Sequence, residues 1–153
     1  MATYTSTACQ TSAAGFFLNP PRYIENGVVA RSASFTFTTS ASSGDVVQMV
    51  PIPRGAQILD TQLDVGGLAA GSNLAINVGD GGSTGRYNTS ASVAAGVNGG
   101  AIFRMTNAAG GGYSYSTDDT IDVIMGTVGS MSGQAVLRLT VFYAFDNATD
   151  GNS

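Results

Sequence analysis

Alternation of apolar and polar residues with a period of two constrains this chain more than any other feature. It is cleanest in residues 59–65, which read L-D-T-Q-L-D-V. A period of two is typical of a strand that buries one face and wets the other. We therefore expect a strand over residues 56–65. Its inward residues would be Leu59, Thr61, Leu63 and Val65, and its outward residues Asp60, Gln62 and Asp64.

A proline-rich corner precedes this strand. Pro51 and Pro53 have no backbone N–H to donate to a sheet. Residues 51–55 are therefore predicted to form a corner or an edge crossing, not part of a central strand.

Other short segments alternate in the same way, and glycine-rich turns such as 79–85 and 107–112 separate them. No window shows the 3.6-residue period of an amphipathic helix. The sequence therefore predicts an all-β fold, a jelly-roll-like β-sandwich of about eight antiparallel strands over residues 32–146. The further strands are expected at 34–39, 45–50, 73–78, 86–93 (the weakest), 101–106, 120–125 and 134–145. Phe35 and Phe37 of the first, and Ile121, Val123 and Met125 of the strand at 120–125, are expected to point inward. The strand at 134–145 is expected to be the longest and the centre of the core, with inward residues Leu137, Leu139, Val141, Tyr143 and Phe145.

The N-terminal region, residues 1–31, is expected to be an extended arm with an anchor, and residues 147–153 a polar tail. Residues 2–15 are small, polar and uncharged. Phe16 and Phe17 follow, ahead of the stiff bend Asn19-Pro20-Pro21. These two aromatic side chains either pack on their own domain or dock on a neighbouring subunit.

The charges exclude several partners. The six basic residues are arginines spread singly along the chain, lysine and histidine are absent, and the net charge is −4. Phosphate-backbone binding needs a basic patch, so we expect no nucleic-acid partner.

No run approaches the roughly 18 apolar residues of a membrane span, so no membrane partner is expected. Cys9 is the only cysteine and forms no internal disulfide, which suits maturation in a cytoplasm.

Catalytic and metal sites are not expected, nor is any cofactor. Without histidine there is no histidine-based triad and no Cys/His zinc site. The loop 79–85 lacks the G-K-[ST] ending of a phosphate-binding loop. Either the cluster of Asp118, Asp119 and Asp122 or Asp80, in the glycine-rich turn, could ligate calcium. The alternative, which we favour, has Asp118 and Asp119 end a turn and places Asp122 on the wet face of a strand.

Tyrosines offer a different kind of site. Tyr113 and Tyr115 alternate beside the loop 107–112. With Tyr87, they could stack on sugars or on a protein partner if they were exposed. The alternative is a pair that packs on its own sheet. A carbohydrate-binding or host-adhesion module is therefore a second function hypothesis.

Four segments in order carry a resemblance to a known family. They are P-I-P-R-G-A-Q-I-L-D-T-Q-L-D-V (51–65), L-A-I-N-V-G-D-G-G-S-T-G-R-Y (74–87), G-G-Y-S-Y-S-T-D-D-T-I-D-V (111–123) and L-R-L-T-V-F-Y-A-F-D (137–146). Over about residues 46–146 the chain resembles the capsid cement, or decoration, proteins of tailed bacteriophages.

This resemblance implies a virion structural protein without enzymatic activity. It would be assembled in the cytoplasm of a bacterial host and would bind the outside of an icosahedral head as a homodimer or homotrimer. There it would contact the major capsid protein and stabilise neighbouring capsomers. A head–tail or tail component is an alternative within the virion. The candidate subunit or capsid contacts are Phe16, Phe17, Arg22, Tyr23, Arg54, Asp60, Asp64, Tyr113 and Tyr115.

Overall fold

A computed structural model describes residues 1–6, 27–37, 41–67, 74–93, 101–128 and 136–145. Every regular element among them is a strand, and they include no helix that could cross a membrane. The strands are β1 (Thr3–Thr5), β2 (Val29–Thr36), β3 (Val46–Ile52), β4 (Ala56–Gly66), β5 (Leu74–Asp80), β6 (Ser83–Val93), β7 (Ala101–Arg104), β8 (Asp119–Val128) and β9 (Val136–Phe145).

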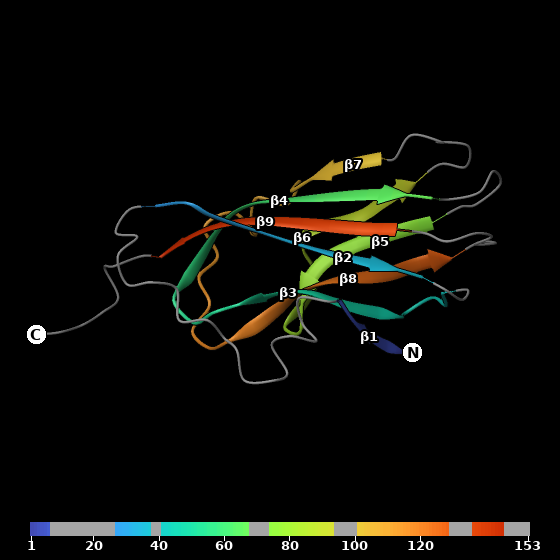
Figure 1. Ribbon diagram of the computed structural model, residues 1–153, viewed down its shortest axis with the longest axis horizontal. Coiled ribbons are helices and arrows are strands. Elements are labelled where there is room, and N and C mark those ends of the chain that lie inside the picture. Colours follow the sequence, from blue (N-terminus) through green and yellow to red (C-terminus); the bar gives the residue numbers. More distant parts are fainter. Residues whose placement is uncertain (7–26, 38–40, 68–73, 94–100, 129–135, 146–153) are drawn as a thin grey trace, which may run out of the picture.

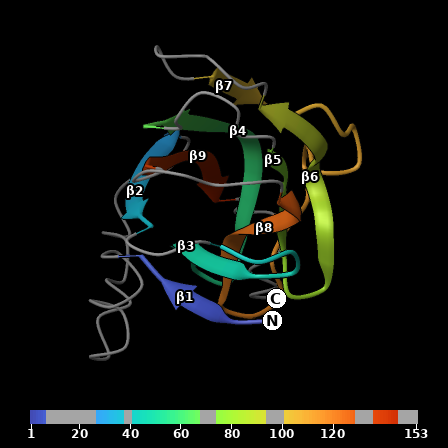
Figure 2. The same cartoon turned by 90° about the vertical axis from the view of Figure 1, so that its right-hand side faces the viewer.

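The strands form two facing sheets, ordered β1-β3-β8-β5-β6 and β2-β9-β4-β7 (Figures 1 and 2). Their pairing is nested: β2 pairs with β9, β3 with β8, β4 with β7 and β5 with β6, all antiparallel. A long hairpin folded on itself and rolled into two sheets gives this order, which is that of a jelly roll. The predicted fold class is therefore confirmed.

The core lies between the two sheets, and most of the alternating residues fill it as predicted. Leu137, Leu139, Val141 and Tyr143 of β9 are fully buried. Strand β9 lies between β2 and β4, so the prediction that it is central to the core is confirmed. It is not the longest strand, however, because β4 and β6 each have eleven residues and β9 has ten.

A β-bulge in β4 overturns one predicted orientation. Ile58 pairs with Tyr143, and Asp60 pairs with the next residue of β9, so Leu59 has no partner of its own. The extra residue shifts the alternation by one. Leu59 is consequently 40% exposed and Ile58 is buried in its place. Thr61, Leu63 and Val65 point inward as predicted.

The proline corner is shorter than predicted. Strand β3 continues through Pro51, which pairs with Thr120 of β8. On its other side β3 pairs with β1 only up to Gln48, so the missing N–H of Pro51 interrupts no ladder of the described residues. The turn itself is Pro53–Gly55, closed by a hydrogen bond from the Ala56 N–H to the Pro53 carbonyl, with Gly55 at φ +84°.

Parts of the predicted arm lie within the sandwich. Residues 3–5 form β1, the one parallel strand among those described, on the edge of β3. β2 begins at Val29, ahead of the expected boundary at residue 31. Residues 7–26 and 146–153 lie outside the described residues, and so do Phe16, Phe17, Arg22, Tyr23 and the tail.

Candidate functional site: a buried polar network and an outer sheet face

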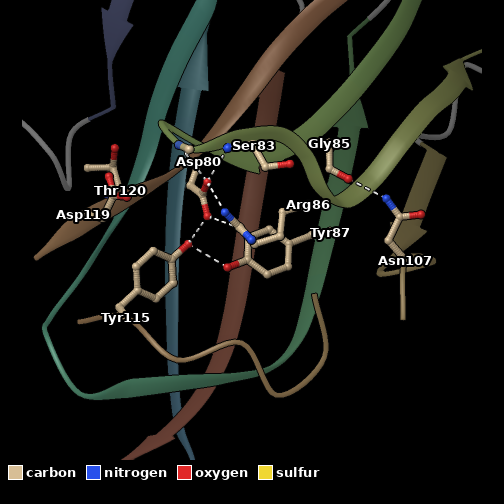
Figure 3. A network of polar contacts seen from close by, with 10 residues as sticks. Asp80, Ser83, Gly85, Arg86, Tyr87, Asn107, Tyr115, Asp119 and Thr120 are labelled. Carbon is tan, nitrogen blue, oxygen red and sulfur yellow. Dashed lines mark hydrogen bonds and ion pairs between the residues drawn. The ribbon is translucent and has the colours of Figure 1, made fainter. Parts of the chain in front are cut away.

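A buried carboxylate, Asp80, organises the tip of the β5–β6 hairpin (Figure 3). The two residues Gly81 and Gly82 join the strands, and Asp80, the last residue of β5, immediately precedes them. Its Oδ1 accepts hydrogen bonds from the backbone N–H groups of Gly82 at 3.0 Å and Ser83 at 2.8 Å. Aspartate suits this position because its carboxylate can cap the turn in this way. Residues 79–85 were predicted as one long turn, but only two of them lie between the strands.

Arg86 neutralises Asp80. Its Nε donates to Asp80 Oδ2 at 2.5 Å and its second guanidinium nitrogen donates to Oδ1 at 3.2 Å. Residues 84–87 bulge out of the β6 ladder, since Val78 pairs with Asn88 and Asp80 with Ser83. The bulge turns Arg86 back over the hairpin. Gly79 makes room for the backbone of this bulge, because a Cβ at position 79 would lie 2.2 Å from the Ser83 carbonyl oxygen.

Two tyrosines extend the network: Tyr87, next to Arg86 on β6, and Tyr115, from the segment between β7 and β8. The Tyr115 hydroxyl donates to Asp80 Oδ2 at 2.8 Å, and its oxygen lies 2.6 Å from the Tyr87 hydroxyl. Since the Tyr115 proton goes to Asp80, Tyr87 is the donor of the second bond. Burial raises the pKa of both hydroxyls, so both stay protonated. Burial would raise the Asp80 pKa as well, but the hydrogen bonds from Arg86, Tyr115 and Ser83 outweigh it and lower that pKa.

The chemistry of this network is structural. Asp80 accepts five hydrogen bonds and faces a paired guanidinium, so it has no free lone pair for a substrate. The Arg86 guanidinium lies 3.7 Å above the centre of the Tyr113 ring, and Tyr113 meets Tyr115 edge to face at 5.1 Å. The network therefore ties the hairpin to the segment 113–115 without leaving a reactive group.

These contacts decide between the two interpretations of the tyrosines. Tyr87 and Tyr115 are 0% and 5% exposed, so neither ring is available to stack on a sugar or a partner. Tyr113 is half-buried under Arg86. The predicted packing of this pair on its own domain holds, but through a polar network, not through an edge strand.

Asp122 differs from its prediction too. It was expected on a wet face of β8, yet it is 6% exposed, and its Oδ1 has no hydrogen-bond partner. Burial, together with the charges of Asp119 and Asp80, raises the Asp122 pKa to about 7. Asp118 accepts a hydrogen bond from the Arg54 N–H at 2.8 Å. Within the described residues no three carboxylates converge on a metal position.

The outward face of the β2-β9-β4-β7 sheet brings together two of the predicted contact residues. Asp60 and Asp64 of β4 both point away from the core. Asp60 forms an ion pair with Arg104 of β7 at 2.6 Å, and Asp64 lies opposite Arg138 of β9. Ile102 of β7 is 62% exposed beside them. We call this surface, made of Asp60, Gln62, Asp64, Ile102, Arg104, Arg138 and Thr140, the outer face.

Arg54 does not join the outer face. It is exposed in the turn between β3 and β4, next to Asp118. Sequence reasoning missed the Asp80 network altogether, because its members come from two separate segments, residues 80–87 and 113–115. The one available signal was glycine: Gly79, and Gly110, where a Cβ would lie 2.6 Å from the Tyr87 ring, both mark a close approach of backbone to its neighbours.

Neither the protein-family models nor the curated proteins contain a match for this sequence. Solved structures do match. A chain of the capsid of Ralstonia phage GP4 superposes with a TM-score of 0.72 at 21% identity, covering 95% of this chain and 99% of the other. A chain of the Cyanophage Pam1 capsid asymmetric unit has a TM-score of 0.66 at 20% identity, with 83% and 91% covered.

A third match comes from the acidic stable capsid structure of Helicobacter pylori bacteriophage KHP30. Its TM-score is 0.51 at 17% identity, and it covers 75% of this chain and 86% of the other. At these identities the similarity concerns the fold. The jelly roll described above is therefore a fold that chains of three phage capsid structures share with this protein.

Proposed function

We propose that this protein is a virion structural protein of a bacteriophage and acts as a capsid cement protein. In this role a homodimer or homotrimer binds the outside of an icosahedral head, contacts the major capsid protein and strengthens the contacts between capsomers. It catalyses no reaction. The similarity to the chain of the Ralstonia phage GP4 capsid, over 95% of this chain and 99% of that one, carries the proposal.

The described surface supports a binding role. The outer face presents paired and oppositely charged side chains on a rigid sheet, so a partner meets a fixed pattern. The Asp80 network leaves no free nucleophile, base or metal ligand. A lattice of identical subunits can multiply weak contacts of this kind into stable attachment.

Binding to heads tests this proposal directly. Heads that lack the protein would be prepared, purified protein added back, and occupancy measured by cryo-electron microscopy. We expect density on the outer surface at symmetric positions and a higher temperature of head disruption. Density at the tail or head–tail junction alone would identify the tail-component alternative and contradict the cement role.

The outer face and the N-terminal arm make separable contributions. Asp64→Arg together with Arg138→Asp inverts two outward charges without touching the core, and removal of residues 1–18 deletes the arm. If the outer face contacts capsomers, the charge variant should lose occupancy while staying folded. Removal of the arm should weaken attachment in the same assay. Unchanged occupancy in either variant would exclude that surface.

The adhesion hypothesis makes a different prediction. It needs exposed aromatic rings, and Tyr87 and Tyr115 are buried. We therefore expect no binding on a broad glycan array. A glycan whose binding is lost in Tyr113→Ala, the half-buried ring, would revive that hypothesis.

A further inference from the structure

We propose that β1 is an exchangeable strand, which each subunit donates to the β3 edge of a second copy of this chain in the assembled oligomer. The inference rests on the self-association included in the proposed function. It adds that the partner is a neighbouring copy and that the site is the β3 edge. Asp45, which binds the Ala2 N–H immediately before β1, is called the clasp of this site.

The docking site on β3 is specific for a strand. Thr3, Tyr4 and Thr5 lie in parallel register with Val46, Val47 and Gln48. The Val46 N–H donates to the Ala2 carbonyl at 2.9 Å, and the Ser6 N–H donates to the Gln48 carbonyl at 2.8 Å. Main-chain bonds of this kind are how an extended segment adds to an exposed sheet edge.

A buried carboxylate fixes the beginning of β1. Asp45 is 3% exposed, and its Oδ1 accepts a hydrogen bond from the Ala2 N–H at 2.7 Å. Its Oδ2 accepts a second bond from the Ser42 N–H at 2.9 Å. Asp45 would thus lose a charge-assisted partner whenever β1 leaves, so the site favours being filled.

Tyr4 supplies the apolar part of the site. Its ring lies 5.6 Å from the ring of Phe35 and 5.7 Å from that of Phe37, at the end of β2. It also faces the inward side of β3, where Val47 is fully buried. β1 lies at the edge of its sheet, beside β3 (Figure 2). One aromatic side chain and a three-residue ladder therefore form a self-contained docking motif there. Among the described strands β1 pairs with β3 alone.

The length of chain between β1 and β2 allows the donor to be another subunit. Tyr4 contacts the end of β2. Because β2 has eight residues and a strand rises about 3.3 Å per residue, the start of β2 lies no more than roughly 25 Å from that contact. Residues 7–26 can span about 60 Å when extended. The link is therefore more than twice as long as its own domain requires. Exchange of an identical element is a low-cost route to a symmetric oligomer, because the contacts are already encoded.

A cysteine pair tests whether β1 is donated between copies. Thr5 and Gln48 are register partners that point outward. Neighbouring strands lie about 4.8 Å apart, within the usual Cα separation of a disulfide. In a Cys9→Ser background, one copy carries Thr5→Cys and a second, larger tagged copy carries Gln48→Cys. The copies are co-expressed, oxidised and run on a non-reducing gel. Exchange predicts a covalent heterodimer, and a matched pair of Thr5→Cys with Ser34→Cys, exposed on β2, predicts none.

A single chain with both Thr5→Cys and Gln48→Cys gives the complementary result. Exchange predicts that most of it joins into covalent dimers or trimers. A purely intrachain bond, with oligomers still present by light scattering, would overturn the exchange and leave self-association intact. A monomer by light scattering would overturn both. Cross-linking of Thr5→Cys to a capsid protein on heads, and to no second copy, would also overturn the proposal.

Asp45→Asn tests the clasp. It keeps the shape of the side chain and removes its charge. We expect the yield of heterodimer to fall at least severalfold, while the circular dichroism spectrum stays that of a folded β protein. An unchanged yield would exclude Asp45 as the clasp.

Discussion

Two ion pairs with the same chemistry differ in burial and should differ in their contribution to stability. The Asp80 and Arg86 side chains are 1% and 17% exposed, whereas Asp60 and Arg104 are 27% and 66% exposed. Removal of one partner from a buried pair leaves an uncompensated charge and costs about 3–5 kcal/mol. An exposed pair contributes about 0–1 kcal/mol.

Asp80→Asn should therefore lower the free energy of unfolding by about 3 kcal/mol, with Arg86 and the Tyr115 hydroxyl left poorly satisfied. Asp60→Asn, the matched control, should lower it by less than about 1 kcal/mol. Equilibrium unfolding in urea measures both. Equal losses in the two variants would show that the network does not stabilise the hairpin.

We expect Asp122 to make the stability of the protein depend on pH. Its pKa is raised from 3.8 to about 7 in the folded state. Between these two pH values the folded state therefore keeps a proton on Asp122 that the unfolded state has released. The stabilisation is present below pH 3.8 and is lost as the pH rises towards 7. Asp80 and Asp45 act oppositely, because their pKa values are lowered and their contribution is lost as the pH falls below 3.8.

We therefore expect maximal stability near pH 4, and a decline towards pH 7 of at most about 1.4 kcal/mol per pH unit. Asp122→Asn should remove the decline and leave the loss at low pH unchanged. Urea unfolding at pH values from 3 to 8 provides the test. A variant that retains the slope between pH 4 and 7 would assign it to another group.

At the scale of the element, the β5–β6 hairpin depends on the close approach of two backbones. A Cβ at Gly79 would lie 2.2 Å from the Ser83 carbonyl oxygen, and backbone cannot move aside as a flexible side chain can. At Gly66 of β4 a Cβ would meet nothing within 4 Å.

Gly79→Ala should lower the free energy of unfolding by about 2–3 kcal/mol, at the upper end of the range for overpacking. Gly66→Ala should be neutral or stabilise by up to about 1 kcal/mol, since it restricts the unfolded chain. Hydrogen exchange of the β5 and β6 amides would locate the effect. Uniform loss of protection in the Gly66 variant would contradict this account.

The strands were predictable to the extent that one face of each is buried. Alternation located Phe35, Leu137 and Leu139 correctly, because all three lie in the β2–β9 ladder, which has no register shift. It failed at Leu59, since a bulge inserts a residue that carries no signature of its own. It failed at Asp122, because a charged residue on an alternating strand predicts a wet face. The Asp80 network depends on contacts between distant segments, which periodicity does not encode.

At the scale of the whole molecule, the last strand completes the fold. β9 lies between β2 and β4, so its hydrogen bonds join the beginning of the sandwich to its middle. β2 and β9 pair residues about a hundred positions apart, as in Ala33 with Leu139. Such long-range pairing slows folding, because loop closure precedes the gain from the contact.

A chain that ends at residue 135 should fail to fold, because β2 and β4 would lose their shared neighbour and the core its four fully buried β9 side chains. Val141→Asp in the full chain should have the same effect, since an unpaired charge would enter the core. Removal of residues 1–6, an edge strand, should leave a folded domain. Circular dichroism and thermal melting distinguish these outcomes. A cooperative transition in the Val141→Asp variant would contradict the assigned core.

The nested pairing also determines how the protein responds to mechanical force. Val29 at the start of β2 lies opposite Tyr143 near the end of β9, so the first residue of β2 and the last residues of β9 lie at the same end of one ladder. Tension applied through Val29 and Tyr143 would break the hydrogen bonds of that ladder one pair at a time, in an unzipping geometry. Tension applied across the outer face would load many hydrogen bonds together. In the proposed role on a shell under internal pressure, a subunit would therefore hold best through its sheet surfaces.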